Sequence, residues 1–410
     1  MNILVVNWTW YPSGGDWTYV ENVVNVYQKK GHTVIPFSMK DDRNFETPYS
    51  EYFIENIDYK KINKRSISAG IKVVAKSIYS TEAQKNLERL LSVVKIDAAH
   101  INVIHHYITP TILKILKDRK IPIVWTLNDY TCICPESTFV SHDEVCERCY
   151  GNAFYNCITH TCKKGSYLAS TVAALESYVH QYLDYYAFVD HFICPSVFSY
   201  NKFKQFNFHT DKLTQLYYCY DPAGIDLTKP KVKLPGERYI IFVGRLEKIK
   251  GALTVLKAML NCPDIHLKIV GTGTQEASLK DFKEKNQLNN VSFEGKKNKQ
   301  DTLALVTNAD FLICASEWYE VLGFTVVEAM ILGRPVIGSD IGAIPEMVLH
   351  NHTGLLFEPG NHEELAALIK QLYNDSAMAE RMGKNAQLHI NTLINTEKHF
   401  EGLQKLIPGL

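Results

Sequence analysis

Residues 239–251 read YIIFVGRLEKIKG, an apolar run that ends in a glycine and is followed by basic side chains. The run Tyr239–Val243 predicts a buried strand of a parallel sheet, because such strands are continuous apolar segments. Gly244 begins a turn after it, which puts Arg245 and Lys250 at the carboxyl end of the strand, where open α/β sheets bind ligands. Both side chains can bind phosphate oxygens. Taken alone, a surface basic pair at the start of a helix explains the segment equally well.

The same alternation of short β-branched runs and longer amphipathic segments extends in both directions from this stretch. Further strands are predicted at Ile3–Asn7, Thr33–Phe37, Ala98–Ile101, Ile121–Leu127, His191–Cys194, His266–Val270, Val291–Phe293, Phe311–Cys314 and Pro335–Ile337. This is the pattern of parallel βαβ units. The predicted fold class is therefore α/β, with two Rossmann-like halves.

The length of 410 residues suits two domains of about 200 residues each. A lysine-rich segment interrupted by prolines at residues 221–236 predicts the linker. The domains expected are an N-terminal Rossmann-like domain over 1–220, with a cysteine-rich insert at 132–162, and a C-terminal Rossmann-like domain over 237–385. Residues 386–410 are expected to form a C-terminal helix that crosses back to the first domain.

A second informative segment, residues 315–330, reads ASEWYEVLGFTVVEAM. We expect Glu320 to end a loop and Glu328 to lie inside a helix that starts near Gly323. A glycine there allows close backbone approach to a ligand, and the free N–H groups of a helix start favour an anion. A solvated glutamate and a glutamate near a helix start are the simpler interpretation of these two residues alone.

Together, these pieces and their order resemble the family-4 retaining glycosyltransferases of the GT-B fold, in which two Rossmann-like domains face each other across a cleft. The matching series is Gly244-Arg245…Lys250-Gly251, Gly271-x-Gly273, Glu320-x7-Glu328, Gly333-x-Pro335-Val336-Ile337, residues 341–346 (IGAIPE) and residues 353–357 (TGLLF). Such an ordered series is far more specific than any one of its pieces.

The resemblance implies an activity and a set of roles. It implies a retaining hexosyltransferase that moves a sugar from a UDP- or GDP-type donor to a saccharide or glycolipid acceptor in cell-surface polysaccharide synthesis, with no cofactor required. Arg245 and Lys250 would bind the donor diphosphate, Glu320 would face the donor sugar, and Glu328 would face the ribose. The other expected donor-binding residues are Gly14, Gly15, Gly244, Gly271, Gly323 and Phe324.

The first half departs from the family pattern at the acceptor side. The family often carries a histidine beside an aspartate at the end of a first-domain strand, and here that place holds Asn128 and Asp129. An amide can hydrogen-bond a sugar hydroxyl but cannot take up a proton near neutral pH. Three histidines, His100, His105 and His106, are candidate neighbours of this place, although structural roles are commoner for such histidines.

Six of the ten cysteines lie between Cys132 and Cys162. Cys146-x2-Cys149 has the spacing of a zinc knuckle, and Cys134 and Cys162 would complete four thiolate ligands of a structural zinc site. Reduced thiols packed in a loop, and disulfides, are the alternatives.

The overall composition limits the classes of partner and the cellular location that we expect. Forty-four basic residues balance forty-four acidic ones, which argues against nucleic acid as the main partner. No charged leader precedes the first apolar run, and no apolar run approaches the roughly 18–20 residues of a membrane span. The sequence therefore favours a cytoplasmic protein, with a peripheral contact at the inner face of a membrane left open.

Two rival functions remain compatible with the sequence. One is a GT-B-fold epimerase that acts on a nucleotide sugar without an acceptor. The other is a nucleotide-sugar-binding protein that has lost catalysis, for which Asn128 is the supporting feature. The products formed from a nucleotide sugar distinguish both from a transferase.

Overall fold

The computed structural model describes residues 1–56, 76–222 and 238–410, so the predicted linker at 221–236 lies almost wholly outside the described residues. The chain divides into two compact units. The first unit comprises Met1–Ser141, Cys146–Tyr220 and Thr396–Leu410, and the second comprises His142–Val145 and Asp221–Asn395. Each unit is built on a six-stranded sheet whose strand pairs are all parallel, which confirms the predicted α/β class with two Rossmann-like halves.

The sheet of the first unit has the strand order β2-β1-β3-β4-β7-β8. Its strands are β1 (Asn2–Val6), β2 (Thr33–Phe37), β3 (Ala98–Ile101), β4 (Ile123–Thr126), β7 (His191–Cys194) and β8 (Leu213–Gln215). The helices α1 (Gly15–Lys29), α3 (Thr81–Val93), α4 (Ile112–Asp118), α6 (Tyr167–Tyr182) and α7 (Val197–Gln205) connect or flank them. Residues Ile3–Val6 are fully buried, as the continuous apolar run predicts.

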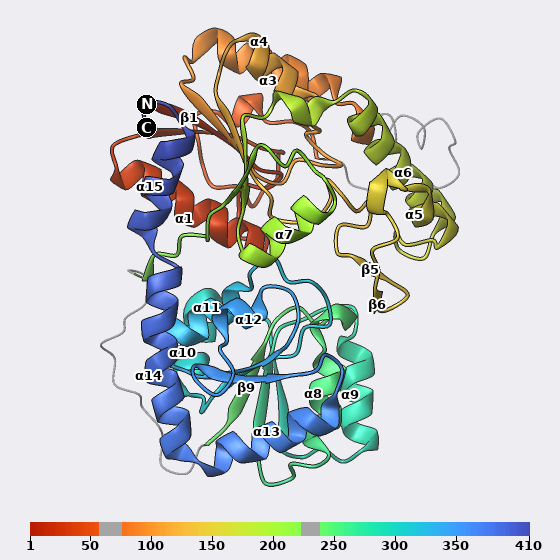
Figure 1. Cartoon of the computed structure of the whole chain (residues 1–410), viewed down its shortest axis with the longest axis vertical. Helices are drawn as coiled ribbons and strands as arrows, with labels where there is room; N and C mark the ends of the chain where they lie inside the picture. The colour runs from red at the N-terminus through yellow and green to blue at the C-terminus, as the bar shows by residue number, and fades with distance from the viewer. Residues whose placement is uncertain (57–75, 223–237) are drawn as a thin grey trace. The chain divides into compact units, whose positions relative to one another are not determined.

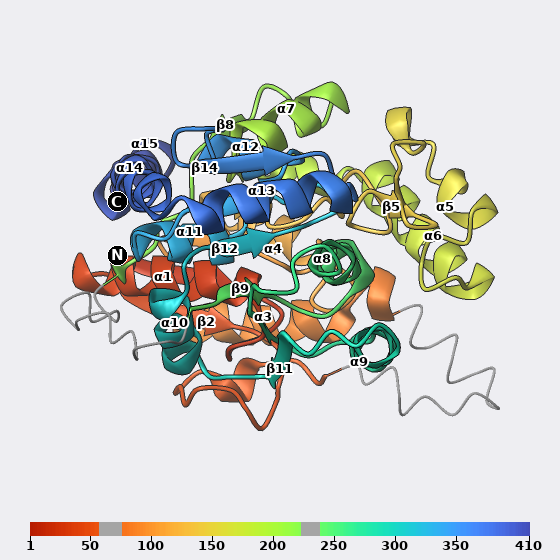
Figure 2. The same ribbon diagram turned by 90° about the horizontal axis from the view of Figure 1, so that it is seen from below.

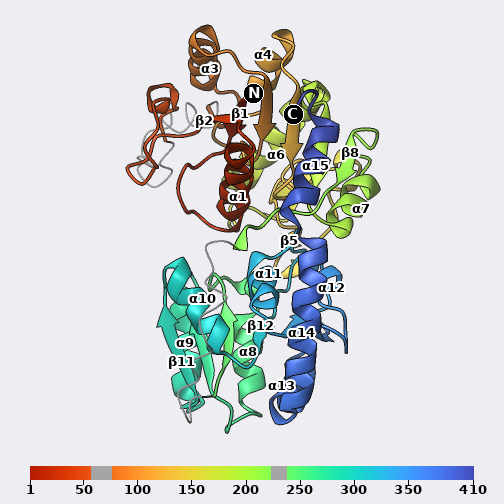
Figure 3. The same ribbon diagram turned by 90° about the vertical axis from the view of Figure 1, so that its left-hand side faces the viewer.

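The C-terminal helix α15 (Thr396–Leu406) belongs to the first unit and lies beside α1 (Figures 1 and 3). Its His399 ring contacts the Tyr19 hydroxyl of α1 through Nε2 at 3.2 Å and the Tyr217 carbonyl through Nδ1 at 2.6 Å. The segment 386–410, predicted as one helix, is instead the end of α14 (Ser376–Leu393) followed by α15, because Ile394 leaves the helical conformation at φ −100°, ψ 83°.

The sheet of the second unit has the order β11-β10-β9-β12-β13-β14. Its strands are β9 (Ile240–Val243), β10 (Leu267–Val270), β11 (Val291–Gly295), β12 (Leu312–Cys314), β13 (Val336–Ser339) and β14 (Gly354–Phe357). Its helices are α8 (Ala252–Met259), α9 (Glu276–Lys285), α10 (Lys299–Asn308), α11 (Phe324–Ile331), α12 (Ile344–Met347), α13 (His362–Asn374) and α14. Helices α8 and α13 pack together over the apolar core (Figure 2).

Residues 132–162 form the insert, which contains the short hairpin β5 (Val140–Ser141) and β6 (Glu144–Val145) and the helix α5 (Tyr155–Thr159). Helix α5 packs against α6 (Figure 2). The buried core of the insert is small: Cys149, Phe154 and Cys157 pack with Ala174 of α6. Among the described residues, no helix combines the length and the apolar character needed to span a bilayer.

Candidate functional site

The strand order of the second unit places the predicted donor residues at a topological switch point. Strand β9 lies between β10, the next strand in the chain, and β12, to which the chain returns after β11. Ligands of open α/β sheets bind at the carboxyl ends of the strands where the order reverses in this way. The loops after β9 and β12 carry Arg245, Lys250 and Glu320, so the geometry puts these three residues on one edge of one sheet.

Backbone contacts hold these two loops together. The Glu317 amide donates to the Ile249 carbonyl at 2.8 Å. Gly251 has a φ of +69°, and a Cβ atom there would stand 1.8 Å from the Ala315 carbonyl oxygen. Only glycine fits this position, because both its backbone conformation and its neighbour exclude a side chain.

Lys250 and Glu320 face each other across the two loops. The Lys250 ammonium donates to Glu320 Oε1 at 2.5 Å, and the Ser316 hydroxyl donates to the same oxygen at 2.7 Å. The Lys250 nitrogen also lies 4.8 Å from the centre of the Trp318 ring. The side chains of Lys250 and Glu320 are 19% and 9% exposed, so the pair is largely shielded from water.

The charge of Glu320 follows from these contacts. Burial by itself would raise the pKa of this carboxyl, but the Lys250 ammonium and the hydrogen bonds outweigh burial and set the pKa below its ordinary value. Glu320 is therefore an ionised acceptor at neutral pH. Lys250 carries three N–H donors, so it can hold Glu320 and still bind another oxygen.

Helix α11 begins at Phe324, where the sequence predicts a helix start. Gly323 precedes it with a φ of +102°. The first turn of a helix has N–H groups without intrahelical partners, which favours an anion there. Glu328 lies one turn inside α11, buried, and pairs with Lys299 of α10. Burial raises the pKa of Glu328, whereas Lys299 lowers it, and burial has the larger effect.

Two other predicted donor residues are placed by backbone packing. Gly271, with φ +142°, follows β10, and a Cβ atom there would stand 1.8 Å from the Gly244 carbonyl oxygen. The loops after β9 and β10 thus touch through their main chains. Arg245 is exposed next to Gly244. Its role with Lys250 on one diphosphate stays a prediction, as do the ligand roles of the other site residues.

The first unit gathers its predicted site residues on its own sheet edge. Gly14 and Gly15 form the start of α1 after β1. Asn128 follows β4, and its amide is engaged at both ends by protein: Oδ1 accepts from the Tyr218 hydroxyl at 2.6 Å, and Nδ2 donates to Asn102 Oδ1 at 3.1 Å. A hydrogen bond of this kind at each end fixes the amide, so Asn128 links strand ends within the first unit.

Asp129 also makes a contact within the protein. Its Oδ1 accepts from the Thr131 amide at 2.8 Å. Burial raises the pKa of Asp129 despite this hydrogen bond. Both Asn128 and Asp129 thus have partners in the protein itself, and an acceptor-binding role for them stays a prediction.

The four cysteines predicted to bind zinc, Cys134, Cys146, Cys149 and Cys162, line one small cavity together with Cys157. All the cysteines are free thiols, and burial raises the pKa of Cys134 and of Cys149 to about 12. Within the described parts of the chain, no group of three or more His, Cys, Asp or Glu side chains has an arrangement that could hold a metal ion. The structure thus brings the four predicted ligands together around one cavity, and their role as zinc ligands stays a prediction.

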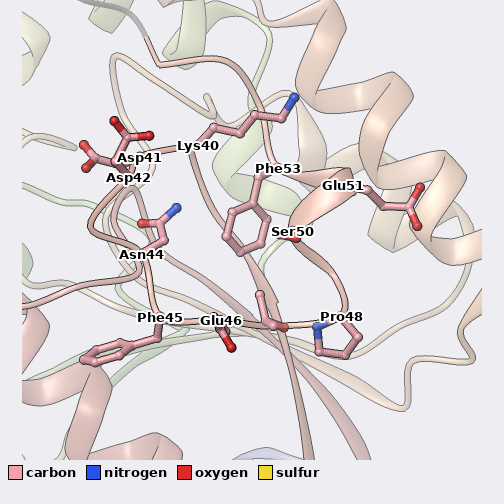
Figure 4. A pocket seen from close by; sticks show the side chains of 11 residues that line it. Lys40, Asp41, Asp42, Asn44, Phe45, Glu46, Pro48, Ser50, Glu51 and Phe53 are labelled. Carbon is pink, nitrogen blue, oxygen red and sulfur yellow. The ribbon is translucent and has the colours of Figure 1, made fainter.

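A hollow of about 850 Å³ lies elsewhere in the first unit, in the loop after β2. Asp41 and Asp42 lie on one side of it and Glu51 on the other, with the Phe53 ring between them (Figure 4). None of the residues predicted from sequence lines this hollow.

Several residues of the site carry no sequence signal that would have identified them. Ser316 and Trp318 lie within the quoted segment, but only the fold shows that they contact Glu320 and Lys250. Lys299 is one of many lysines on polar helices, and its pairing with Glu328 needs the packing of α10 on α11. The position of Lys299 in the helix after β11 is at most a weak indication that it pairs with Glu328.

Comparison with known proteins agrees with this geometry. Residues 225–389 match the family described as glycosyl transferases group 1. A glycogen synthase of Mycobacterium tuberculosis is 32% identical over 162 residues, which cover 38% of this chain and 39% of the relative. A D-rhamnosyltransferase of Pseudomonas aeruginosa is 30% identical over 160 residues, covering 38% and 42%. The chain spans less than half the length of these curated relatives.

Solved structures extend the similarity to the whole chain. The sucrose-phosphate synthase of Thermosynechococcus elongatus superposes with a TM-score of 0.69 at 18% identity, covering 99% of this chain and 98% of that one. Anabaena HepE in complex with UDP and glucose gives 0.67 at 18% identity, with both chains fully covered. This likeness confirms the GT-B fold.

Proposed function

We propose that this chain is a retaining glycosyltransferase that takes its sugar from a nucleoside-diphosphate donor bound by the second unit. The observation that best supports this proposal is the switch point between β9 and β12. The loops there hold Lys250, Ser316 and Glu320 in contact, and α11 starts just after them. The match of residues 225–389 to the group 1 glycosyl transferases falls on this same unit. UDP is bound in the HepE structure, and a UDP- or GDP-type donor suits the proposed site.

The proposed chemistry follows from the charges. A hydroxyl oxygen of the acceptor forms a bond to the anomeric carbon, and the bond from that carbon to the diphosphate oxygen breaks. The electron pair leaves with the diphosphate, which takes up the hydroxyl proton on the same face. Lys250, Arg245 and the N–H groups at the start of α11 stabilise the charge that develops on the diphosphate. Glu320 orients the donor sugar through its hydroxyls, and Glu328 binds the ribose.

The acceptor class proposed is a saccharide or glycolipid of a cell-surface polysaccharide. Retention is expected because departure and attack occur on the same face of the sugar. No metal ion takes part in this scheme, since the positive side chains and the helix start meet the diphosphate.

The test is product analysis with UDP- and GDP-sugars and a panel of saccharide acceptors. The proposal expects released nucleoside diphosphate and an equal amount of glycosylated acceptor with the anomeric configuration of the donor. An epimerised nucleotide sugar would support the epimerase, and nucleotide binding without turnover would support a non-catalytic binding protein. Arg245→Gln should lower transfer at least tenfold, whereas Lys257→Gln, an exposed lysine on α8, should leave it unchanged.

A further inference from the structure

Helix α6 of the first unit buries small side chains and exposes large apolar ones. The buried side packs on α5 and on the rest of the unit, and includes Ala173, Ala174 and Ser177. The large exposed side chains on α6 and directly after it are Tyr167, Leu168, Leu175, Tyr178, Tyr182 and Leu183. At about 100° per residue, these six fall within one half of the helix circumference. We call this half the outer face of α6; Figure 2 shows the helix at the margin of the unit, beside α5.

The outer face is apolar along its whole length. Tyr182, Leu168 and Tyr167 are 88%, 75% and 65% exposed. All of residues 167–183 are described, and the ionisable acid and histidine among them, Glu176 and His180, are buried on the inner side. No charged side chain therefore interrupts the outer face.

The outer face is large enough to form one side of a stable interface. Tyr155 of α5 is exposed and extends it, since the Tyr155 amide donates to the Tyr178 hydroxyl at 3.0 Å. At about 200 Å² for a fully exposed large side chain, these four tyrosines and three leucines expose roughly 800 Å². The largest apolar patch of an ordinary monomer covers about 300–600 Å². One partner of a standard-size interface buries about 800 Å², so the outer face has the area that a stable dimer needs.

The two ends of α6 carry opposite charges. Lys164 lies three residues before the helix and Asp184 two residues after it, and both are exposed. The Asp184 side chain is 3.9 Å from Nε2 of His209 and remains 64% exposed. If two α6 helices pack antiparallel, Lys164 of each copy comes to the end where the other copy carries Asp184. The ends and the helix dipoles are then complementary.

We propose that two copies of this chain form a dimer about a two-fold axis, with the outer face of one α6 packed antiparallel on the outer face of the other. A two-fold interface uses the same patch on both copies, and an uncharged patch meets itself without repulsion. Leu175 lies at the middle of α6, so the two copies of Leu175 meet near the axis. Tyrosine, which contributes much of the outer face, is enriched in protein interfaces. The dimer does not depend on the proposed transfer reaction.

The charges favour a second copy over a membrane surface. Helices that lie on a membrane carry lysine and arginine beside their apolar face, which attract anionic headgroups. Residues 167–183 contain neither lysine nor arginine, and the exposed acid Asp184 follows them. An anionic membrane would repel that end of the helix, whereas the antiparallel copy brings Lys164 to it.

Sedimentation velocity of the full chain, from about 1 μM to about 100 μM, tests the proposal. Leu175→Lys places two like charges near the axis and should weaken the dimer at least tenfold. Leu388→Lys is the matched control, because Leu388 is an exposed leucine on α14 of the second unit. Lys164→Glu and Asp184→Lys should each weaken the dimer, and the double variant Lys164→Glu/Asp184→Lys should restore it, since the exchange recreates opposite charges at each end.

The expected result is a mass of two chains for the wild type and for Leu388→Lys, and a mass of one chain for Leu175→Lys at the same concentration. Circular dichroism should show the same helix content in all variants. A monomeric wild type, or a dimer that Leu175→Lys leaves unchanged, would overturn the proposal, and a double charge variant weaker than either single one would refute the antiparallel arrangement. Flotation with phosphatidylglycerol vesicles runs in parallel: a monomeric wild type that floats, and a Leu175→Lys variant that does not, would assign the outer face to a membrane instead.

Discussion

At the scale of single residues, the pair formed by Lys250 and Glu320 is the feature that sequence reasoning described least well. The sequence predicted that both residues face a ligand, and the structure shows that they also face each other at 2.5 Å. They are separated by 70 positions, so their contact depends on β9 and β12 being neighbours in the sheet. A rule based on the spacing of residues along the chain cannot predict such a contact.

This pairing changes the expected effect of mutation. Lys250→Met leaves the ionised Glu320 buried without its cation, which should cost about 3–5 kcal/mol of unfolding free energy. The double variant Lys250→Met/Glu320→Gln removes both charges and should recover most of that loss. Urea unfolding of the single and double variants measures the loss of unfolding free energy and its recovery. If Lys250→Met is as stable as the wild type, Glu320 does not depend on Lys250 for its stability in the folded protein.

Gly251 offers a second test at this scale. Gly251→Ala must displace the Ala315 carbonyl, since its Cβ would come within 1.8 Å of that oxygen. Gly295 has the same φ of +69° with nothing within 4 Å of a Cβ atom, so Gly295→Ala carries the backbone cost alone. We expect about 1 kcal/mol for Gly295→Ala and more than twice that for Gly251→Ala, by urea unfolding. Equal losses would contradict the close packing of the two loops.

At the scale of elements, the strands follow the sequence closely and the polar contacts do not. Buried parallel strands are apolar runs, so β1, β3 and β9 lie within a residue or two of the predicted bounds. Helix α6 ends at Tyr182, because Asp184 takes a left-handed conformation at φ +48°. No pattern in the sequence reveals that Glu176 on this helix meets His106.

Helix α15 provides the prediction at this scale. The ring of His399 is buried and bonded to Tyr19 and to the Tyr217 carbonyl. His399→Ala should therefore destabilise the first unit by about 1–3 kcal/mol, since it leaves a buried hydroxyl and carbonyl without this partner. Glu397→Ala, which removes only the exposed ion pair with Lys30, should cost less than about 1 kcal/mol. Thermal unfolding compares them, and equal effects would argue against docking through His399.

At the scale of the whole molecule, both units use one architecture, a six-stranded sheet whose strand order reverses beside the unit's first strand, β1 in one and β9 in the other. The sequence was sufficient to predict two α/β halves, whereas the donor-binding roles of residues in the second half stay predictions. The predicted zinc site stays a prediction, because cysteine spacing does not fix how the thiols of a small loop pack.

Buried histidines make the first unit sensitive to acid. Burial lowers the pKa of His100 and of His105 to about 3 and that of His399 to about 4. These folded values lie below the unfolded value of about 6.5. The stability they contribute is therefore fully present above pH 6.5 and lost as the pH falls toward 4. Near pH 5 each histidine costs about 2 kcal/mol.

Tryptophan emission of the full chain should report this loss, because Trp8, Trp10, Trp17 and Trp125 all lie in the first unit. We expect the thermal midpoint to fall steeply between pH 6.5 and pH 4.5. A midpoint that stays constant down to pH 4 would show that these histidines are not buried in the neutral form.

The central claim is that a nucleoside diphosphate binds at the switch point of the second unit. Isothermal titration of UDP and GDP into the wild type, the double variant Lys250→Met/Glu320→Gln and the control Lys257→Gln tests it most directly. The account predicts one site per chain for at least one of the two nucleotides, an affinity at least tenfold weaker in the double variant, and no change in the control. Equal affinity in all three proteins, or no binding of either nucleotide to the wild type, would contradict it.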